Sequence, residues 1–135
     1  MRAVLVDTGP LVALMDRSDP DHGRCTQALR RLRDPLVTVW PVITEAMYLL
    51  GQVSWRAQDA LWQALEAIPT LALGDSDAQR MRALMAKYRD LPMDLADAAI
   101  VAVAERERIR SVFTLDARDF GLYRPARLSR FALIP

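Results

Sequence analysis

The chain has 135 residues, of which 52% are hydrophobic and 26% charged. This balance supports one buried core and excludes a disordered protein. With one cysteine and one histidine, the chain can form neither an internal disulfide nor a structural zinc site. The net charge of +1 gives no long-range basic field that would indicate a nucleic-acid-binding protein. No apolar run is long enough for a signal peptide or a membrane span, so we expect a cytoplasmic protein.

Short apolar runs alternate with helical patterns along the chain. In chain order, the pattern predicts a strand at 3–6, a helix from 8, a helix at 20–32, a strand at 36–40, a helix from 41, a helix at 56–67, a strand at 70–73, a helix at 75–89, a helix at 95–107, a strand at 111–115, a turn at 118–121 and an edge strand at 128–134. This alternation predicts a single α/β domain, residues 1–135, with a parallel sheet under helices.

Two of the predicted strands end at an aspartate. Asp7 follows the strand at 3–6, and Asp116 follows the strand at 111–115. Because ligands bind outside the carboxyl ends of parallel strands, both carboxylates are expected at one functional edge of the sheet. Each aspartate could also have a purely structural role, since this residue commonly caps a helix or opens a turn.

Further acids lie near the starts of two predicted helices. Glu45 is one turn into the helix from 41, and Asp97 is in the first turn of an apolar helix. Asp94 and Asp97 are three residues apart and share a face that continues to Val101, so both are expected to be partly buried. Taken alone, each acid could instead be solvated or favour the positive end of a helix dipole.

Together these acids predict a cation site. Carboxylates a few ångströms apart repel each other by about 4 kcal/mol per pair at an effective dielectric of about 20, so protons or a cation must compensate. Oxygen ligands without histidine or thiolate favour Mg²⁺, with Mn²⁺ as the substitute. Since Mg²⁺ held by carboxylates takes substrate phosphates as further ligands, the site indicates phosphoryl chemistry.

Four segments resemble the acidic motifs of PIN domains, and they are Val4–Leu11, Ile43–Ala46, Leu95–Ala102 and Val112–Phe120. In length and spacing the chain is similar to VapC-type toxins of bacterial toxin–antitoxin pairs. The resemblance covers nearly the whole chain. It implies a three-layer α/β/α domain with a central, mainly parallel sheet.

The resemblance also implies an Mg²⁺-dependent endoribonuclease that is selective for single-stranded RNA. The family's catalytic and metal-site acids match Asp7, Glu45, Asp97 and Asp116. Asp119 and Asp94 match further metal-site acids of some members, which leaves open whether Asp116 or Asp119 faces the metal. The family implies a cognate VapB-type antitoxin whose tail enters the acidic groove, and a homodimer.

The expected reaction is metal-assisted hydrolysis. A cation held chiefly by Asp7 and Asp97 would polarise the phosphate and acidify a water, while Glu45 or Asp116 orients that water or holds a second ion. The products would be 3′-hydroxyl and 5′-phosphate ends. The single histidine, His22, lies in an aspartate-rich loop or helix start and is not expected to catalyse.

Basic and aromatic residues could serve RNA or a partner protein. Arginines cluster at 30–33, 106–110 and 124–130, and each cluster could bind phosphates or be simple solvated surface. Trp55 and Trp62 share a helix face and, like Met81 and Met85, are expected in the core or in a groove for an antitoxin helix.

Two other functions stay open. An aspartate that ends a strand can accept a phosphoryl group, as in haloacid-dehalogenase-like phosphatases and response-regulator receivers. However, Gly9 stands where the former need a second aspartate, and Lys87 is the only lysine. A catalytically inactive PIN-fold RNA-binding or scaffold protein is the main alternative, which an assay of metal-dependent RNA cleavage would distinguish from a nuclease.

Overall fold

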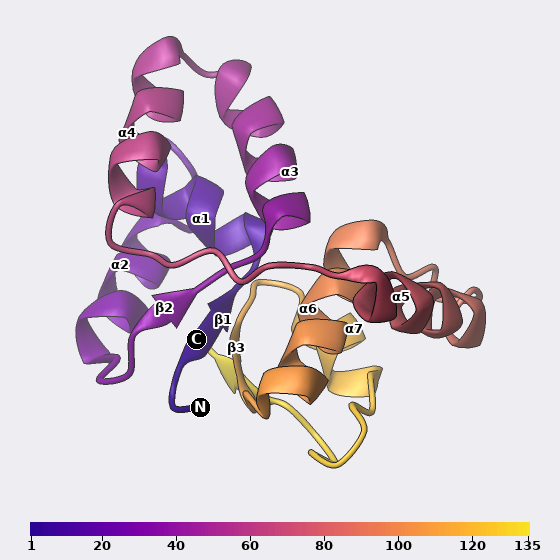
Figure 1. Ribbon diagram of the computed structural model, residues 1–135. Helices are drawn as coiled ribbons and strands as arrows, with labels where there is room; N and C mark the ends of the chain where they lie inside the picture. The colour runs from indigo at the N-terminus through magenta and orange to yellow at the C-terminus, as the bar shows by residue number, and fades with distance from the viewer.

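The computed structural model describes residues 1–135 and forms an α/β domain (Figure 1). Its first half contains β1 (Val4–Val6), α1 (Thr8–Met15), α2 (His22–Arg31), β2 (Leu36–Val37), α3 (Trp40–Gly51) and α4 (Trp55–Leu65). Its second half contains α5 (Asp75–Lys87), α6 (Leu95–Glu107), β3 (Ser111–Phe113), α7 (Ala117–Leu122) and β4 (Ala132–Ile134). None of the helices combines the length and the apolar character that a bilayer span requires.

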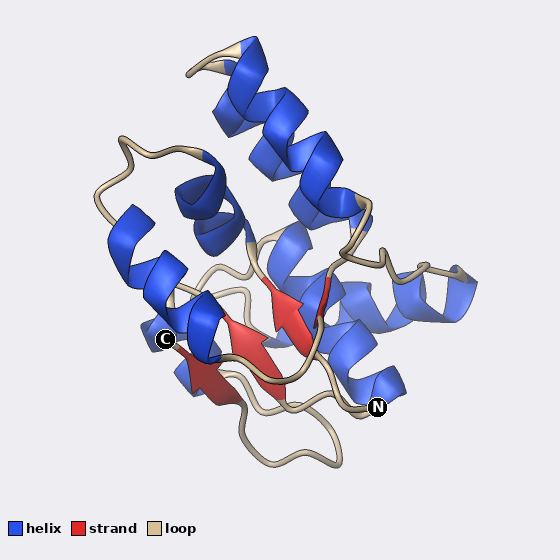
Figure 2. Ribbon diagram, turned by 90° about the vertical axis from the view of Figure 1, so that its left-hand side faces the viewer, coloured by secondary structure: helices blue, strands red, loops and turns tan.

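The strands form one sheet in which every pairing is parallel, in the order β2-β1-β3-β4. Val4 of β1 pairs with Leu36 on one side and with Ser111 on the other. Parallel neighbours need crossover connections, and the helices supply them. Figure 2 shows the three larger strands side by side, all pointing the same way. The predicted parallel sheet is confirmed, and its order places the residue after β1 in the middle of the carboxyl edge.

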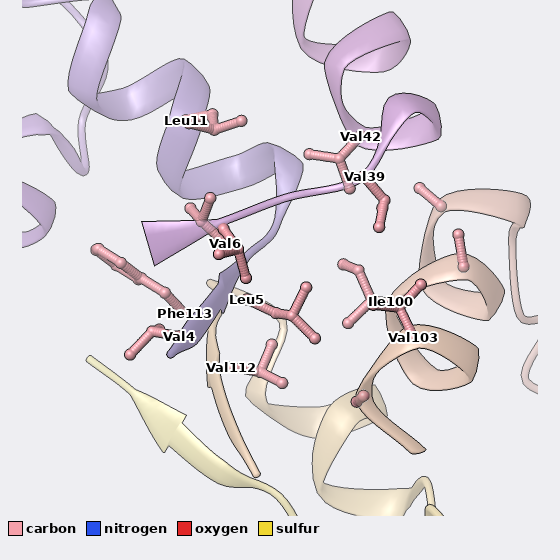
Figure 3. Close-up of a cluster of buried hydrophobic side chains, with 14 of the residues drawn as sticks. Val4, Leu5, Val6, Leu11, Val39, Val42, Ile100, Val103, Val112 and Phe113 are labelled. Carbon is pink, nitrogen blue, oxygen red and sulfur yellow. The ribbon is translucent and has the colours of Figure 1, made fainter. Parts of the chain in front are cut away.

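Helices cover both faces of the sheet, as Figure 3 shows around β1. Val6 points toward Leu11 of α1, whereas Leu5 points toward Ile100 and Val103 of α6. All five side chains are fully buried. Successive strand residues face opposite sides, so a strand covered on both faces reads as a continuous apolar run. The expected three-layer α/β/α arrangement is therefore observed, and it fixes β1 as the rigid base of the site.

Two predicted elements are wrong. The predicted strand at 70–73 is only an isolated parallel bridge between Thr70 and Thr38, because the chain turns away after one pair of backbone bonds. The predicted turn at 118–121 is helix α7, and Gly121 lies inside its last turn. The backbone N–H of Asp119 donates to the Asp116 carboxylate at 3.1 Å, so an N-terminal cap outweighs the local preference of glycine.

The paired aromatic and methionine side chains have separate locations. Met81 is buried and Met85 half-buried against the core. Trp55 and Trp62 are 66% and 48% exposed, so the core alternative is wrong for both tryptophans. They leave a large apolar surface on α4 without a covering element.

Candidate active site

The carboxyl edge of the sheet opens into a cleft of about 460 Å³. Asp7 reaches it from the end of β1, Glu45 from α3 and Asp97 from the first turn of α6. No basic side chain lines the cleft. Its carboxylates belong to Asp7, Asp19, Glu45, Asp94, Asp97, Asp116 and Asp119. The structure thus brings together all six acids that the sequence selected and adds Asp19.

Asp7 is the most tightly held of these acids and is only 8% exposed. Its Oδ1 accepts a hydrogen bond from the backbone N–H of Thr8 at 2.8 Å, and its Oδ2 accepts one from the Thr114 hydroxyl at 2.9 Å. The Thr114 hydroxyl in turn accepts from the backbone N–H of Asp116 at 3.0 Å. One threonine at the end of β3 therefore links the two strand-end acids.

Asp97 lies at the start of α6, where Asp94 caps the helix. The backbone N–H of Asp97 donates to Asp94 Oδ1 at 2.8 Å, and the Tyr123 hydroxyl donates to Asp97 Oδ2 at 2.7 Å. Asp97 is half-buried, as predicted. Asp94 is exposed, so its predicted burial is wrong. As the capping residue, Asp94 stands outside the helix and does not share its inward face.

Asp116 and Asp119 reach the same part of the cleft. Asp97, Asp116 and Asp119 each place a carboxylate oxygen within 4.8 Å of the other two. The cap that Asp116 makes for α7 holds Asp119 beside it. The sequence left these two acids as alternatives, whereas the structure places both next to Asp97.

The crowding of negative charge affects ionisation. Burial raises the pKa of Asp97 to about 8, against the lowering effect of the Tyr123 hydrogen bond and with help from Asp94 and Asp7. Burial also raises the pKa of Asp7 and that of Glu45, and the charge of Asp94 adds to both shifts. Since each shift disfavours the charged form, a bound cation would relieve all three.

The chemistry of the cleft fits a hard divalent cation. Every charged group on its lining is a carboxylate, and neither histidine nor cysteine lines it. The hydroxyl of Thr8, which lines the same cleft, is buried and has no hydrogen-bond partner. A buried hydroxyl without a partner is costly. An ion with its water ligands would satisfy both the hydroxyl and the carboxylates.

Two residues of this region are not predicted by any pattern in the sequence. Asp19 lies in the loop between α1 and α2, where its Oδ1 accepts from the backbone N–H of Asp21 at 2.8 Å. The Asp19-Pro20 pair marks a turn, but nothing in it predicts the direction of the carboxylate. Tyr123 follows α7 without any helical or strand periodicity. His22 is absent from the cleft lining, and its Nδ1 lies 2.7 Å from the Ala13 carbonyl.

Two of the arginine clusters are engaged within the protein. Arg106 pairs with Asp77, and Arg110 donates to the Arg130 carbonyl at 3.1 Å. Arg124 donates to the Gly121 carbonyl at 2.6 Å. Of these contacts only the Arg106–Asp77 ion pair neutralises a positive charge, so the other two arginines keep their charge at the surface.

Comparison with known families decides the relationship. The model of the PIN domain family matches residues 4–128. The chain belongs to the PIN domain family. This PIN domain is 33% identical over 98% of its length to ribonuclease VapC26 of Mycobacterium tuberculosis, and the match covers all of that relative. The predicted VapC-type resemblance is therefore confirmed.

Solved structures share the fold of this PIN domain. VapC20 of M. tuberculosis, described as a sarcin-ricin loop cleaving toxin, gives a TM-score of 0.79 at 18% identity and covers 85% of this chain and 91% of its own. A toxin–antitoxin complex from Klebsiella pneumoniae gives 0.69 at 24% identity, with 88% and 91% covered. VapBC2 from Rickettsia felis, bound to a promoter DNA fragment, gives 0.69 at 12% identity, with 97% and 98% covered.

Proposed function

We propose that this PIN domain is a divalent-metal-dependent endoribonuclease of the VapC type. The observation that carries the proposal is the convergence of carboxylates from β1, α3, α6 and the β3–α7 segment on one cleft without a basic side chain. A relative that is 33% identical is named a ribonuclease, which supports RNA as the substrate. RNA as substrate also supports a site of action in the cytoplasm.

Asp97, Asp116 and Asp119 are the residues that would hold the cation, with Asp7 beside them. An all-oxygen set of this kind favours Mg²⁺, with Mn²⁺ as a substitute. When bound, the cation supplies positive charge at the scissile phosphate and acidifies water. Asp94 adds negative charge at the rim and keeps Asp97 in place through the helix cap.

The remaining chemistry belongs to the protein's own side chains. Asp7 accepts two hydrogen bonds and cannot rotate freely, so it would be a fixed ligand for the cation. Glu45 is exposed on α3, and its longer side chain can orient the attacking water and accept its proton. Partial desolvation of its carboxyl at the cleft, together with the charges of Asp94 and Asp7, raises the pKa of Glu45, which suits a proton acceptor at neutral pH. Hydrolysis by water leaves a 3′-hydroxyl and a 5′-phosphate.

A cognate VapB-type antitoxin would neutralise the enzyme, in keeping with a solved structure of similar fold that is a toxin–antitoxin complex. An arginine of its tail could form bidentate bonds with Asp7 or Asp97 in the place of the metal. Leu49 lines the cleft and, like Val53 and the two tryptophans of α4, is exposed. This apolar surface could hold the apolar side chains of the tail. The test is a titration of the complex with Mg²⁺ at fixed ionic strength, which should weaken antitoxin binding.

A homodimer would bury a second apolar groove. Trp40, Tyr48 and Leu95 are among the exposed large hydrophobic residues, and they line a groove of about 700 Å³ beside Glu45. Exposed apolar side chains that lie together commonly mark protein interfaces. Light scattering of the wild type and of Tyr48→Glu would test the groove, because a charge there should give a monomer.

The decisive experiment is cleavage of a single-stranded RNA oligonucleotide with Mg²⁺, with Mn²⁺ and with a chelator. We expect cleavage with either metal, none with the chelator, and products that carry 5′-phosphate. A duplex of the same sequence is the control. Cleavage in the chelator, or cyclic phosphate ends, would exclude this mechanism. Tight RNA binding without cleavage would instead identify an inactive PIN-fold RNA-binding protein.

A further inference from the structure

Tyr123 lies directly behind Asp97. Its side chain is fully buried, and its hydroxyl donates to Asp97 Oδ2 at 2.7 Å. Two of the cleft acids accept a hydrogen bond from a threonine or tyrosine hydroxyl, namely Asp7 from Thr114 and Asp97 from Tyr123. The Tyr123 hydroxyl thus holds Asp97 by a hydrogen bond, as the Thr114 hydroxyl holds Asp7.

An aromatic cluster holds the ring of Tyr123 in place. Its centroid lies 5.0 Å from the Tyr88 ring and 5.1 Å from the Phe120 ring, both in edge-to-face geometry. Phe120 in turn packs 5.9 Å from Phe131. The cluster joins the residue after α5, helix α7 and the segment before β4. Since such pairs resist rotation of the ring, the hydroxyl is directed at Asp97 before any ligand binds.

We infer that Tyr123 is a positioning residue of the proposed metal site. Its hydroxyl fixes the carboxylate of Asp97 in the orientation that faces Asp116 and Asp119. The inference rests on the proposed function, because positioning has a purpose only if these acids act together. Hydrogen bonds that orient a metal ligand typically change metal affinity or activity by about 10- to 100-fold when they are removed.

A matched pair of variants separates positioning from packing. Tyr123→Phe removes the hydroxyl and keeps the ring. Tyr88→Phe makes the same change on the neighbouring ring, whose hydroxyl accepts from the backbone N–H of Arg124 at 2.8 Å and touches no acid of the cleft. Circular dichroism melting curves would establish that both variants are folded.

The measurement is Mn²⁺ binding to each protein by calorimetry, together with the Mg²⁺ concentration that gives half-maximal RNA cleavage. We expect Tyr123→Phe to bind Mn²⁺ about 10- to 100-fold more weakly and to need correspondingly more Mg²⁺, with no change for Tyr88→Phe. Equal Mn²⁺ affinity in Tyr123→Phe and the wild type would overturn the inference, as would an equal loss in both variants.

The two readouts also separate this inference from the function on which it rests. If the wild type binds Mn²⁺ but does not cleave RNA, the proposed function is wrong. The difference in Mn²⁺ affinity between the wild type and Tyr123→Phe still decides the role of the hydroxyl. If RNA is cleaved and that difference is absent, the nuclease stands and the positioning role does not.

Discussion

Charged side chains gather in two regions of this PIN domain, and only one region neutralises them. Between α5 and α6, Arg80 bonds to both oxygens of Glu105 at 2.7 and 2.9 Å, and Arg106 pairs with the buried Asp77. In the cleft, seven carboxylates line a space without any arginine or lysine. Similar side chains therefore meet opposite electrostatic environments at the two ends of α6.

The ionisation of the two regions differs accordingly. Burial alone would raise the pKa of Glu105, but the hydrogen bonds from Arg80 and from the backbone of Ala126 lower it. Burial raises the pKa of Asp97, and no cationic side chain opposes the shift. Paired acids hold two helices together, whereas unpaired acids store unfavourable energy that a cation can release. This contrast distinguishes a structural cluster from the proposed metal site.

Asp97→Asn should have the largest effect, because it removes an acid close to both Asp116 and Asp119. We expect RNA cleavage to fall more than about 100-fold, because removing even a group that only orients a metal ligand can lower activity by about 100-fold. The variant should remain folded, because a repelling charge is lost. Initial rates of cleavage at saturating Mg²⁺ provide the measurement. Asp34→Asn, outside the cleft, is the matched control, and a similar loss there would contradict the assignment.

Addition of Mg²⁺ or Mn²⁺ should stabilise the wild type. A ligand that binds only the folded state, present at a concentration 100 times its dissociation constant, raises the free energy of unfolding by about 2.7 kcal/mol. This corresponds to several degrees in melting temperature. The measurement is a thermal melt with and without metal. Asp7→Asn should show a much smaller increase, and a variant with Arg106 replaced by glutamine should show the full increase. Stabilisation by Zn²⁺ alone would argue against an all-oxygen site.

Arg106→Gln should destabilise the paired region by about 1–3 kcal/mol, because it leaves the Asp77 carboxylate buried without its cation. Urea unfolding measures this loss. Adding Asp77→Asn should recover part of the stability, since the unpaired buried carboxylate is then replaced by a neutral amide. If the double variant is no more stable than Arg106→Gln, the pair contributes through packing and not through charge.

The smallest predicted effect is a pH dependence of the metal-free protein. Asp97 has a pKa of about 8 in the fold and about 4 in the unfolded chain. The unfolded chain therefore loses its proton first, and the free energy of unfolding should fall as the pH rises from about 4 to about 8. With solvent screening at the open cleft, we expect a loss of about 1–2 kcal/mol. Urea unfolding in a chelator should show a shallower slope for Asp97→Asn, and identical slopes would contradict the prediction.

The sequence predicts the parts of this molecule that depend on local pattern. The buried run at Val4–Val6 and the acid after it predict both β1 and the position of Asp7, because a strand covered on both faces must be apolar and must end at the functional edge. Helix α6 begins at Leu95 and ends at Glu107, as predicted, since Asp94 caps an unbroken apolar segment.

Other features depend on contacts that no local pattern contains. Helix α7 exists because Asp116 caps it and Phe120 is buried beneath it, although Gly121 suggests a turn. Tyr123 reaches Asp97 only because the fold brings the residue after α7 beside the first turn of α6. The residue that orients Asp97 is thus 26 positions away in the sequence, and no local pattern connects the two.

The place of β1 in the sheet has a consequence for dividing the protein. The chain from α4 to α5 runs across the molecule as a long loop (Figure 1). A cut there would leave Asp7 and Glu45 in one fragment and Asp97, Asp116 and Asp119 in the other. Because β1 pairs with β2 of its own fragment and with β3 of the other, the fragments have a preformed seam at which to reassociate. The enzyme is therefore suited to a split reporter in which cleavage of RNA signals that two fused proteins have met.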